Sequence, residues 1–171
     1  MILTSDHGEM FQKGVSGHST PLVFEPGVRV PLIISAPGQR QRQDVHTLTS
    51  TVDLLPSILQ IAGKAPPAWC EGEPLPQLGG EARSDGSIFI VEAKKNTAYQ
   101  PLSKATVALL QGPYKLVHYR GYKNFSGKYE LYNLEDDPDE LQDIYAGHPA
   151  AKRLQDELDE RLNAADEPYR G

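Results

Sequence analysis

The sequence predicts an α/β fold followed by a small antiparallel sheet that a C-terminal helix covers. Short apolar runs and one helical pattern alternate with turn residues in residues 1–63. Strand-like runs then follow one another between residues 87 and 134, and leucines recur every four residues near the C-terminus. A strand-and-helix order is typical of α/β proteins, whereas strands joined by short turns favour antiparallel pairing.

Residues 1–63 carry the α/β pattern. Met1-Ile2-Leu3 is an apolar run typical of an interior strand of a parallel sheet, and residues 30–34 form a second run that Ala36-Pro37-Gly38 closes. A helix is expected next, because its apolar residues recur on one helical face before a glycine at position 63. These apolar residues are Val52, Leu55, Ile58, Leu59 and Ala62.

A loop and a second region complete the chain. Residues 64–87 are rich in proline and glycine and predict a connecting loop. In residues 88–171 we expect antiparallel strands near residues 87–92, 105–110, 114–119 and 129–134, with a hairpin turn at residues 111–113. Leu154, Leu158 and Leu162 then predict an amphipathic helix with one apolar stripe to bury.

Composition limits the classes of partner. The chain has 171 residues, of which 39% are hydrophobic and 23% charged, so it can bury a core. Its net charge of −6 argues against nucleic acid or an anionic membrane as partner. No apolar run approaches the roughly 18 residues of a membrane-spanning helix. Cys70 is the single cysteine, so no internal disulfide is possible, and a structural or incidental role is expected.

Candidate chemistry begins where the first strand ends. Asp6 and His7 follow that strand directly, and ligands of open α/β sheets bind at the carboxyl ends of strands. A carboxylate is a hard oxygen donor, while neutral imidazole suits zinc, manganese or iron. The pair therefore predicts a divalent cation without naming it. The alternative from these two residues alone is that Asp6 caps a turn and His7 is an ordinary surface residue.

Longer motifs add a resemblance to a family. The segments SDHGE, GHSTP, FEPGVRVPLIISAPG and TVDLLPSILQIAG occur in order within the first 63 residues. GPYKLVHYRGY and KYELYNLEDDPDELQDIYAGHP follow in the last third. Together they resemble the end of the catalytic domain and the C-terminal subdomain of sulfatases, in the alkaline-phosphatase-like superfamily. The resemblance runs from residue 1 to about residue 162 and is poor only in the loop at residues 64–87.

The resemblance implies a fold, a reaction and site residues. Residues 1–63 would be the end of the catalytic α/β sandwich, and residues 88–171 the C-terminal subdomain. The reaction would be hydrolysis of sulfate esters of a small molecule or a sugar, with a divalent cation, calcium being favoured over manganese or zinc. Asp6 would be a metal ligand, His7 a second ligand or a neighbour of the metal, and His18 the group that contacts the sulfate oxygens or the leaving group.

Other features of the family pattern are not found in this sequence. The family's formylglycine nucleophile arises in a Cys/Ser-x-Pro-x-Arg motif, which neither Cys70 nor any serine here fits, and the usual N-terminal pair of aspartates is also missing. We therefore expect the nucleophile upstream of Met1 in a longer protein, and no turnover by this chain alone. In the family, residues 1–6 correspond to an interior strand, so we also expect an exposed sheet edge that allows self-association.

The resemblance leaves alternatives open. Many sulfatases have lysine where His18 stands and asparagine where His7 stands, and an Asp-His pair also occurs in related phosphonate and phosphodiester hydrolases. A hydrolase of that kind, or a non-catalytic binding module, therefore remains an alternative. Localisation stays open, and the family suggests the periplasm or secretion if a signal precedes the chain.

Some polar residues are expected to be structural. Arg29 and Glu25 are expected in ion pairs, and Asp53 is expected to cap or orient the helix that follows it. His118 lies within a predicted strand and is expected to be packed.

Overall fold

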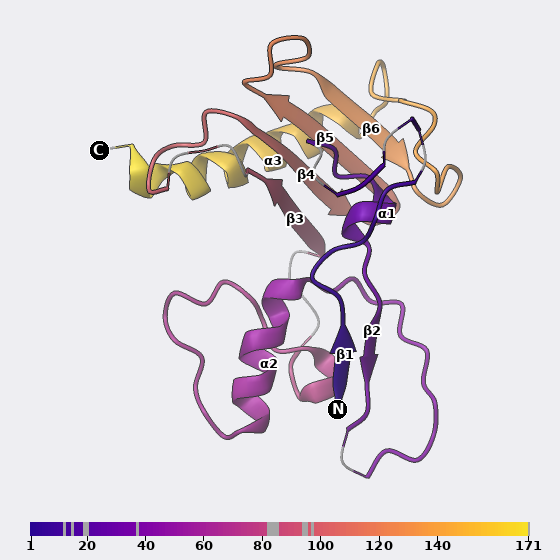
Figure 1. The fold of residues 1–171 in the computed structure, drawn as a ribbon, viewed down its shortest axis with the longest axis vertical. Coiled ribbons are helices and arrows are strands. Elements are labelled where there is room, and N and C mark those ends of the chain that lie inside the picture. The colour runs from indigo at the N-terminus through magenta and orange to yellow at the C-terminus, as the bar shows by residue number, and fades with distance from the viewer. Residues whose placement is uncertain are drawn as a thin grey trace. The chain divides into compact units, whose positions relative to one another are not determined.

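The computed structural model describes residues 1–11, 13–14, 16–18, 21–36, 38–81, 86–93, 96 and 98–170. The chain folds as two compact units (Figure 1). The first unit comprises Met1–Asp6 and Pro31–Ile88, and the second comprises His7–Val30 and Phe89–Gly171. Residues 7–30 thus pack with the C-terminal part of the chain. The units therefore do not follow the division into residues 1–63, 64–87 and 88–171 that the sequence suggests.

The first unit contains a two-stranded sheet and a helix. Strand β1 (Ile2–Thr4) pairs with β2 (Leu32–Ile34) in antiparallel register, with Leu3 opposite Ile33. A short 3-10 turn, η1 (Thr51–Asp53), leads into helix α2 (Leu54–Ile61), and the C-cap Ala62 precedes Gly63 at a φ of 66°. In the described part of residues 64–87, the regular structure is the 3-10 turn η2 (Pro76–Leu78) and the first residue of strand β3 (Ser87–Glu92).

The parallel partner expected for the first strand is not found in the described structure, whereas the exposure of this strand is the one expected at a sheet edge. Its partner β2 runs antiparallel, and the Leu3 side chain is 48% exposed. A three-residue apolar run does not encode the direction of its neighbour, because both sheet types use the same aliphatic side chains.

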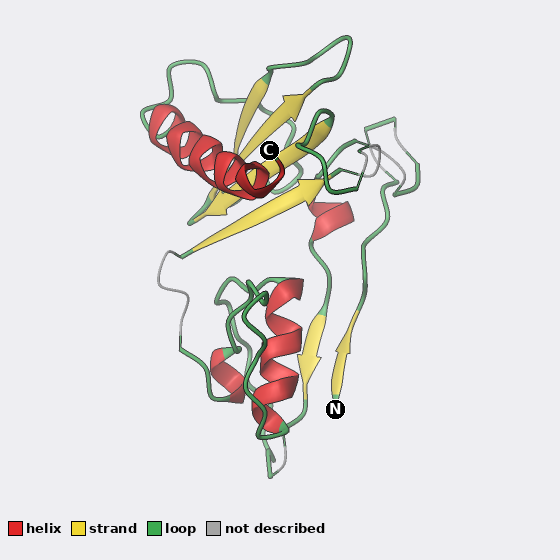
Figure 2. Cartoon of the chain, turned by 90° about the vertical axis from the view of Figure 1, so that its left-hand side faces the viewer, coloured by secondary structure: helices red, strands yellow, loops and turns green. Residues whose placement is uncertain are grey.

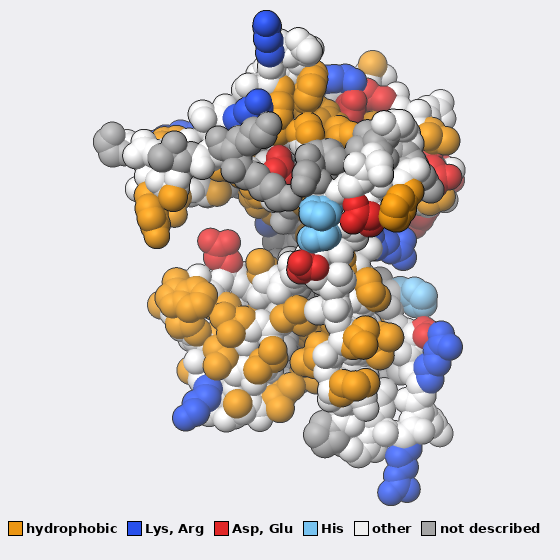
Figure 3. Space-filling view, in the orientation of Figure 1, with side chains coloured by type: hydrophobic (Ala, Val, Ile, Leu, Met, Phe, Trp, Pro, Cys, Tyr) orange, Lys and Arg blue, Asp and Glu red, His pale blue; other side chains and the backbone are white. Residues whose placement is uncertain are grey.

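The first unit also exposes much of its apolar surface. The helix was correctly predicted, but its apolar face is not covered: Ile58 and Ile61 are 51% and 54% exposed, and Ile33 of β2 is 55% exposed. An apolar groove lies between the end of this helix and the β1–β2 pair, lined in part by Ile2, Ile34, Ile58 and Ile61. Figure 3 shows hydrophobic side chains gathered over this unit.

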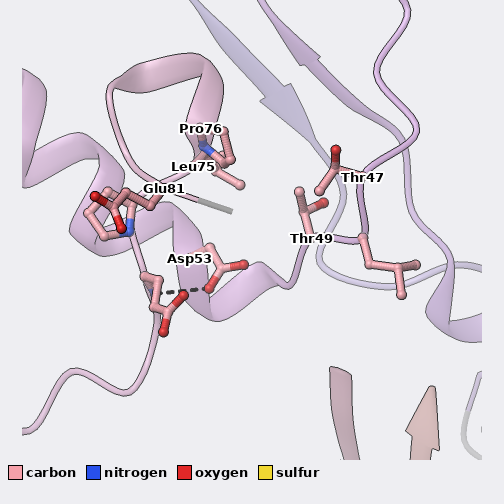
Figure 4. A pocket seen from close by; sticks show the side chains of 9 residues that line it. Thr47, Thr49, Asp53, Leu75, Pro76 and Glu81 are labelled. Atoms are coloured by element: carbon pink, nitrogen blue, oxygen red, sulfur yellow. Dashed lines mark hydrogen bonds between the residues drawn. The ribbon is translucent and has the colours of Figure 1, made fainter. Parts of the chain in front are cut away.

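Asp53 organises the start of α2, as expected. Its carboxylate accepts hydrogen bonds from the backbone N–H of Ser50 at 2.8 Å and of Glu73 at 3.1 Å. Ser50 and Asp53 thereby form a capping box, which satisfies backbone donors at the helix start. Figure 4 shows Asp53 beside a cavity of about 10 Å³, lined by Thr47, Thr49 and Leu75 among others. Such a volume holds about one water molecule, so a structural role for Asp53 follows.

The second unit is built on a four-stranded sheet in the order β3-β4-β5-β6. Its strands are β3 (Ser87–Glu92), β4 (Ala105–Gln111), β5 (Tyr114–Arg120) and β6 (Tyr129–Asn133). β4, β5 and β6 pair antiparallel, and Gly112 and Pro113 form the predicted hairpin turn between β4 and β5. Gly112 has a φ of 56°, a left-handed conformation that glycine adopts without strain.

Helix α3 (Ala151–Asp166) lies across one face of this sheet (Figure 2). The predicted stripe of Leu154, Leu158 and Leu162 is buried against side chains of β4, β5 and β6. Val107 and Leu109 point to this face because they alternate along β4 with residues that point to the other. Among the described residues, no helix has the length and apolar character needed to cross a membrane.

The other face of the sheet packs against the segment of residues 7–30. Met10, Val23 and Phe24 of this segment are buried together with Val117 and Tyr132 of the sheet. The segment includes a single helical turn, α1 (Glu25–Val28), which the sequence did not predict and which has Pro26 near its start. The C-terminal sheet is thus the support for the segment that carries His7 and His18.

Candidate functional site

Two backbone contacts shape the segment that carries the candidate residues. The Gly8 N–H donates to the Gly27 carbonyl at 2.9 Å, and the Gly17 N–H donates to the Met10 carbonyl at 2.9 Å. A Cβ at Gly8 would lie 2.0 Å from the Pro26 carbonyl oxygen, so only glycine allows this approach. Gly17 has a φ of 99°, which also favours glycine. The segment therefore closes on itself through glycines near both candidate histidines.

This closure brings His7, Glu9 and His18 together. Met10 and Gly17 form an antiparallel bridge, so Glu9 and His18 are the next pair of residues across it. The Nδ1 of His18 lies 3.2 Å from Oε2 of Glu9, and the two side chains are 42% and 39% exposed. The His7 and His18 rings stack with centroids 3.9 Å apart and planes inclined by 27°. The two predicted histidines are thus neighbours, with a carboxylate that the sequence analysis did not single out.

Local hydrogen bonds orient both rings. His7 Nδ1 lies 2.9 Å from its neighbouring Gly8 carbonyl oxygen, which can only accept, so Nδ1 carries the proton in this contact. The same reasoning makes His18 Nδ1–H the donor to the carboxylate oxygen of Glu9. In the His18 ring, Nε2 is then the nitrogen that Glu9 does not engage. Backbone and carboxylate acceptors of this kind hold imidazoles in functional orientations.

Asp6 is the last residue of the first segment of the first unit, and His7 is the first residue of the second unit. The Ser5 hydroxyl donates to Asp6 Oδ1 at 3.4 Å, and the Asp6 side chain is exposed. The structure defines the surroundings of each residue within its own unit. A cation shared by Asp6 and His7 stays a prediction.

A buried charge cluster anchors the end of this segment on the sheet. Lys115 of β5 is fully buried, and its Nζ lies 3.0 Å from Glu25 Oε1 and 2.9 Å from Glu140 Oε1. Glu140 Oε2 also accepts the backbone N–H of Glu25 at 2.7 Å. Lys13 donates to the Glu140 carbonyl at 2.6 Å and lies 3.6 Å above the Phe24 ring. Partial burial lowers the pKa of Lys13, against the attraction of Glu140.

This cluster joins three stretches of chain far apart in sequence. Glu25 was expected in an ion pair, which is confirmed, whereas Lys115 and Glu140 were not singled out. The local sequence does not indicate this pairing, because Lys115 has the pattern of an ordinary polar residue in a strand. The sequence does indicate Glu9 as a neighbour of His7, because residues two apart lie on the same side of an extended segment.

The other structural expectations have mixed outcomes. His118 is packed, at 8% exposure, and its ring stacks on Tyr129 with centroids 4.2 Å apart. Burial lowers its pKa, although a hydrogen bond to the Lys128 carbonyl opposes that shift. The side chain of Arg29, expected in an ion pair, is exposed.

Curated proteins similar to this chain are sulfatases. Arylsulfatase K of Mus musculus is 29% identical over 168 residues, which cover 96% of this chain and 29% of that protein. The Delta 4,5-hexuronate-2-O-sulfatase of Bacteroides thetaiotaomicron is 28% identical over 182 residues, covering 99% of this chain and 36% of that protein. The chain therefore spans about a third of the length of these relatives.

Solved structures share the fold. A candidate sulfatase from Bacteroides thetaiotaomicron matches 98% of this chain and 36% of its own, with a TM-score of 0.75 and 24% identity. BT4656, in complex with its substrate D-glucosamine-2-N,6-O-disulfate, matches 98% of this chain and 34% of its own, with a TM-score of 0.66 and 25% identity. These neighbours confirm the predicted fold class.

A family model covers most of the chain. The model described as "N-sulphoglucosamine sulphohydrolase, C-terminal" matches residues 18–167, a range that begins at His18 and includes the whole sheet and α3. The resemblance noted from the FEPGVRVPLIISAPG and KYELYNLEDDPDELQDIYAGHP motifs, which lie within this range, is thereby confirmed. The chain belongs to the N-sulphoglucosamine sulphohydrolase C-terminal family of the sulfatases.

Proposed function

We propose that this chain supplies part of the active site of a hydrolase that cleaves sulfate esters of sugars. Its family and its relatives support sulfate-ester chemistry. A sugar substrate is supported by the hexuronate sulfatase among the relatives and by the neighbour that binds a disulfated glucosamine. The observation that carries the proposal is the pairing of His18 with Glu9, which fixes an imidazole on an exposed turn.

His18 would act on the sulfate group. Because Glu9 accepts from Nδ1, the Nε2 edge of the ring is left to meet substrate. An N–H at Nε2 can donate to a sulfate oxygen, or give its proton to the departing alkoxide. A nucleophile approaching a sulfate ester is repelled by the ester oxygens, so a donor placed there stabilises the charge that develops.

Asp6 would hold a divalent cation, with His7 as a second ligand or as its neighbour. An exposed carboxylate suits calcium, which takes hard oxygen ligands, and we favour calcium over manganese or zinc at Asp6. A divalent cation supplies charge neutralisation at the ester oxygens when bound. The formylglycine nucleophile would come from residues outside this sequence, so the 171-residue chain alone would be inactive.

The test is sulfate release by the continuous polypeptide that contains residues 1–171 and the residues encoded before Met1. We expect it to release sulfate from D-glucosamine-2-N,6-O-disulfate, to stop after chelation of divalent cations, and to recover with calcium. The 171-residue chain assayed in parallel should give no release. Cleavage of a phosphonate monoester or a phosphodiester in preference to the sulfate ester would contradict the proposed reaction, as would turnover by the chain alone.

We also propose that the isolated chain self-associates through the first unit. Leu3 and Ile33 are half exposed on a two-stranded sheet, and exposed strand edges and apolar patches favour association. Light scattering should show oligomers that Ile33→Ser reduces. A monomer at high concentration would refute this proposal without affecting the proposed reaction.

A further inference from the structure

His7, Glu9 and His18 form a compact set of metal-ligating side chains. Each offers one ligand atom, and these atoms all lie within 4.8 Å of one another. Figure 3 shows histidine side chains beside acidic side chains on the surface of the molecule. All three residues belong to the second unit, so their arrangement depends on that unit alone.

The backbone places this set on one side of the segment. Met10 is 1% exposed and points into the core against the sheet, so its neighbour Glu9 points the opposite way. His18 lies across the Met10–Gly17 bridge from Glu9 and contacts it. A Cβ at Gly17 would lie 3.6 Å from Glu9 Oε1, an ordinary contact, so glycine is favoured there by its φ of 99° and not by lack of space. The buried Met10 therefore fixes the backbone that carries Glu9 against the core of the second unit.

One pair of ligand atoms already has the spacing of a tetrahedral cation. Metal–ligand bonds of about 2.0–2.1 Å in a tetrahedral zinc site put neighbouring ligand atoms roughly 3.3 Å apart. His18 Nδ1 and Glu9 Oε2 are 3.2 Å apart, so the cation could replace the proton between them. The ligand atom that His7 offers lies within 4.8 Å of the other two, so a rotation of this exposed side chain out of its stack on His18 would bring it to the cation.

The donor types select the class of cation. Two imidazoles and one carboxylate suit zinc and similar transition metals, whereas calcium takes six or more oxygen ligands. Three protein ligands also leave a fourth position for water, as in open zinc sites.

We propose that His7, Glu9 and His18 bind a zinc-class divalent cation, at a site that includes His7 but not Asp6 of the proposed calcium site. This site needs no residue outside the second unit and does not rest on the proposed hydrolysis. The cation would take the Nδ1 edge of His18, whereas the proposed sulfate contact uses Nε2, so the two ligands meet the same ring at different nitrogens.

Isothermal titration of the 171-residue chain with zinc, and the visible absorption of bound cobalt, test the site. We expect one zinc per chain, intense cobalt bands of tetrahedral coordination, and no displacement by millimolar calcium. Glu9→Gln and His18→Gln should each weaken zinc binding by more than the roughly tenfold that loss of a supporting hydrogen-bond partner costs. His46→Gln is the matched control, since His46 is an exposed histidine of the first unit.

Several results would overturn the site: no zinc binding, binding that calcium displaces, octahedral cobalt spectra, or equal affinity in His18→Gln and the parent chain. Circular dichroism of each variant shows whether it is folded, so a lost signal is assigned to the ligand. Failure of sulfate hydrolysis would leave the zinc titration unchanged, and the two proposals therefore fail independently.

Discussion

Replacing Lys115 by methionine should strongly destabilise the second unit. The Lys115 ammonium is fully buried and is the cation within 3.0 Å of both the Glu25 and Glu140 carboxylates. Methionine keeps most of the volume but leaves the Glu140 carboxylate, which is also fully buried, without its partner. Breaking a buried pair by removing one member costs about 3–5 kcal/mol of unfolding free energy.

Urea denaturation measures this loss. At an m-value of about 2 kcal/mol/M, a loss of 3–5 kcal/mol lowers the midpoint by roughly 1.5–2.5 M. Far-UV circular dichroism is the suitable signal, since the single tryptophan, Trp69, lies in the first unit. Amide exchange should also accelerate in residues 7–18, because the cluster anchors their segment on the sheet.

Two further variants make the reasoning refutable. Lys115→Met with Glu140→Gln removes the uncompensated charge and keeps an acceptor for the Glu25 N–H, so it should be more stable than the single variant. Lys152→Met removes an exposed lysine paired with Asp156 on α3 and should leave the midpoint unchanged. A midpoint shift below roughly 0.5 M in Lys115→Met, or a double variant no better than the single, would refute a stabilising ion-pair cluster.

Three other outcomes are expected. Gly8→Ala should destabilise the second unit and weaken zinc binding, because its Cβ meets the Pro26 carbonyl at 2.0 Å. Gly27→Ala, with its nearest contact at 3.9 Å, should do neither, and equal effects in both would argue against the steric reason. Burial lowers the pKa of His118 from 6.5, so the unfolded state binds a proton first and stability should fall as pH drops below 6.5. The slope is at most about 1.4 kcal/mol per pH unit, and a His118→Gln variant with the same slope would contradict this cause. Ile58→Ser should reduce self-association measured by light scattering, as Ile58 is 51% exposed in the first unit, and unchanged oligomers would exclude that surface.

The second unit was largely predictable because its strands and helix have regular patterns. Leu154, Leu158 and Leu162 specify both the helix and its buried face, and the break at Gly112 specifies the hairpin between β4 and β5. The first unit was less predictable. Its helix followed from periodicity, but Ile58 and Ile61 are exposed, since an apolar stripe shows what can be buried and not what covers it.

The candidate site was predicted in part. His7 and His18 were chosen from motifs, and their ring contact depends on the Met10–Gly17 bridge, which local periodicity does not show. Glu9 was overlooked beside two more obvious neighbours. Lys115 lies 90 residues from Glu25, and a long-range pair of this kind has no signature in a single sequence.

The role of His18 in sulfate-ester hydrolysis is tested most directly by kcat/KM for sulfate release from D-glucosamine-2-N,6-O-disulfate. The polypeptide is the continuous one that includes the residues before Met1, compared with its His18→Ala and His148→Ala variants. The proposed role predicts a loss of about a hundredfold or more for His18→Ala, as for removal of a group that acts on developing charge. His148→Ala, a change in the loop before α3, should retain the parent value. Equal kcat/KM in His18→Ala and the parent polypeptide would contradict the account.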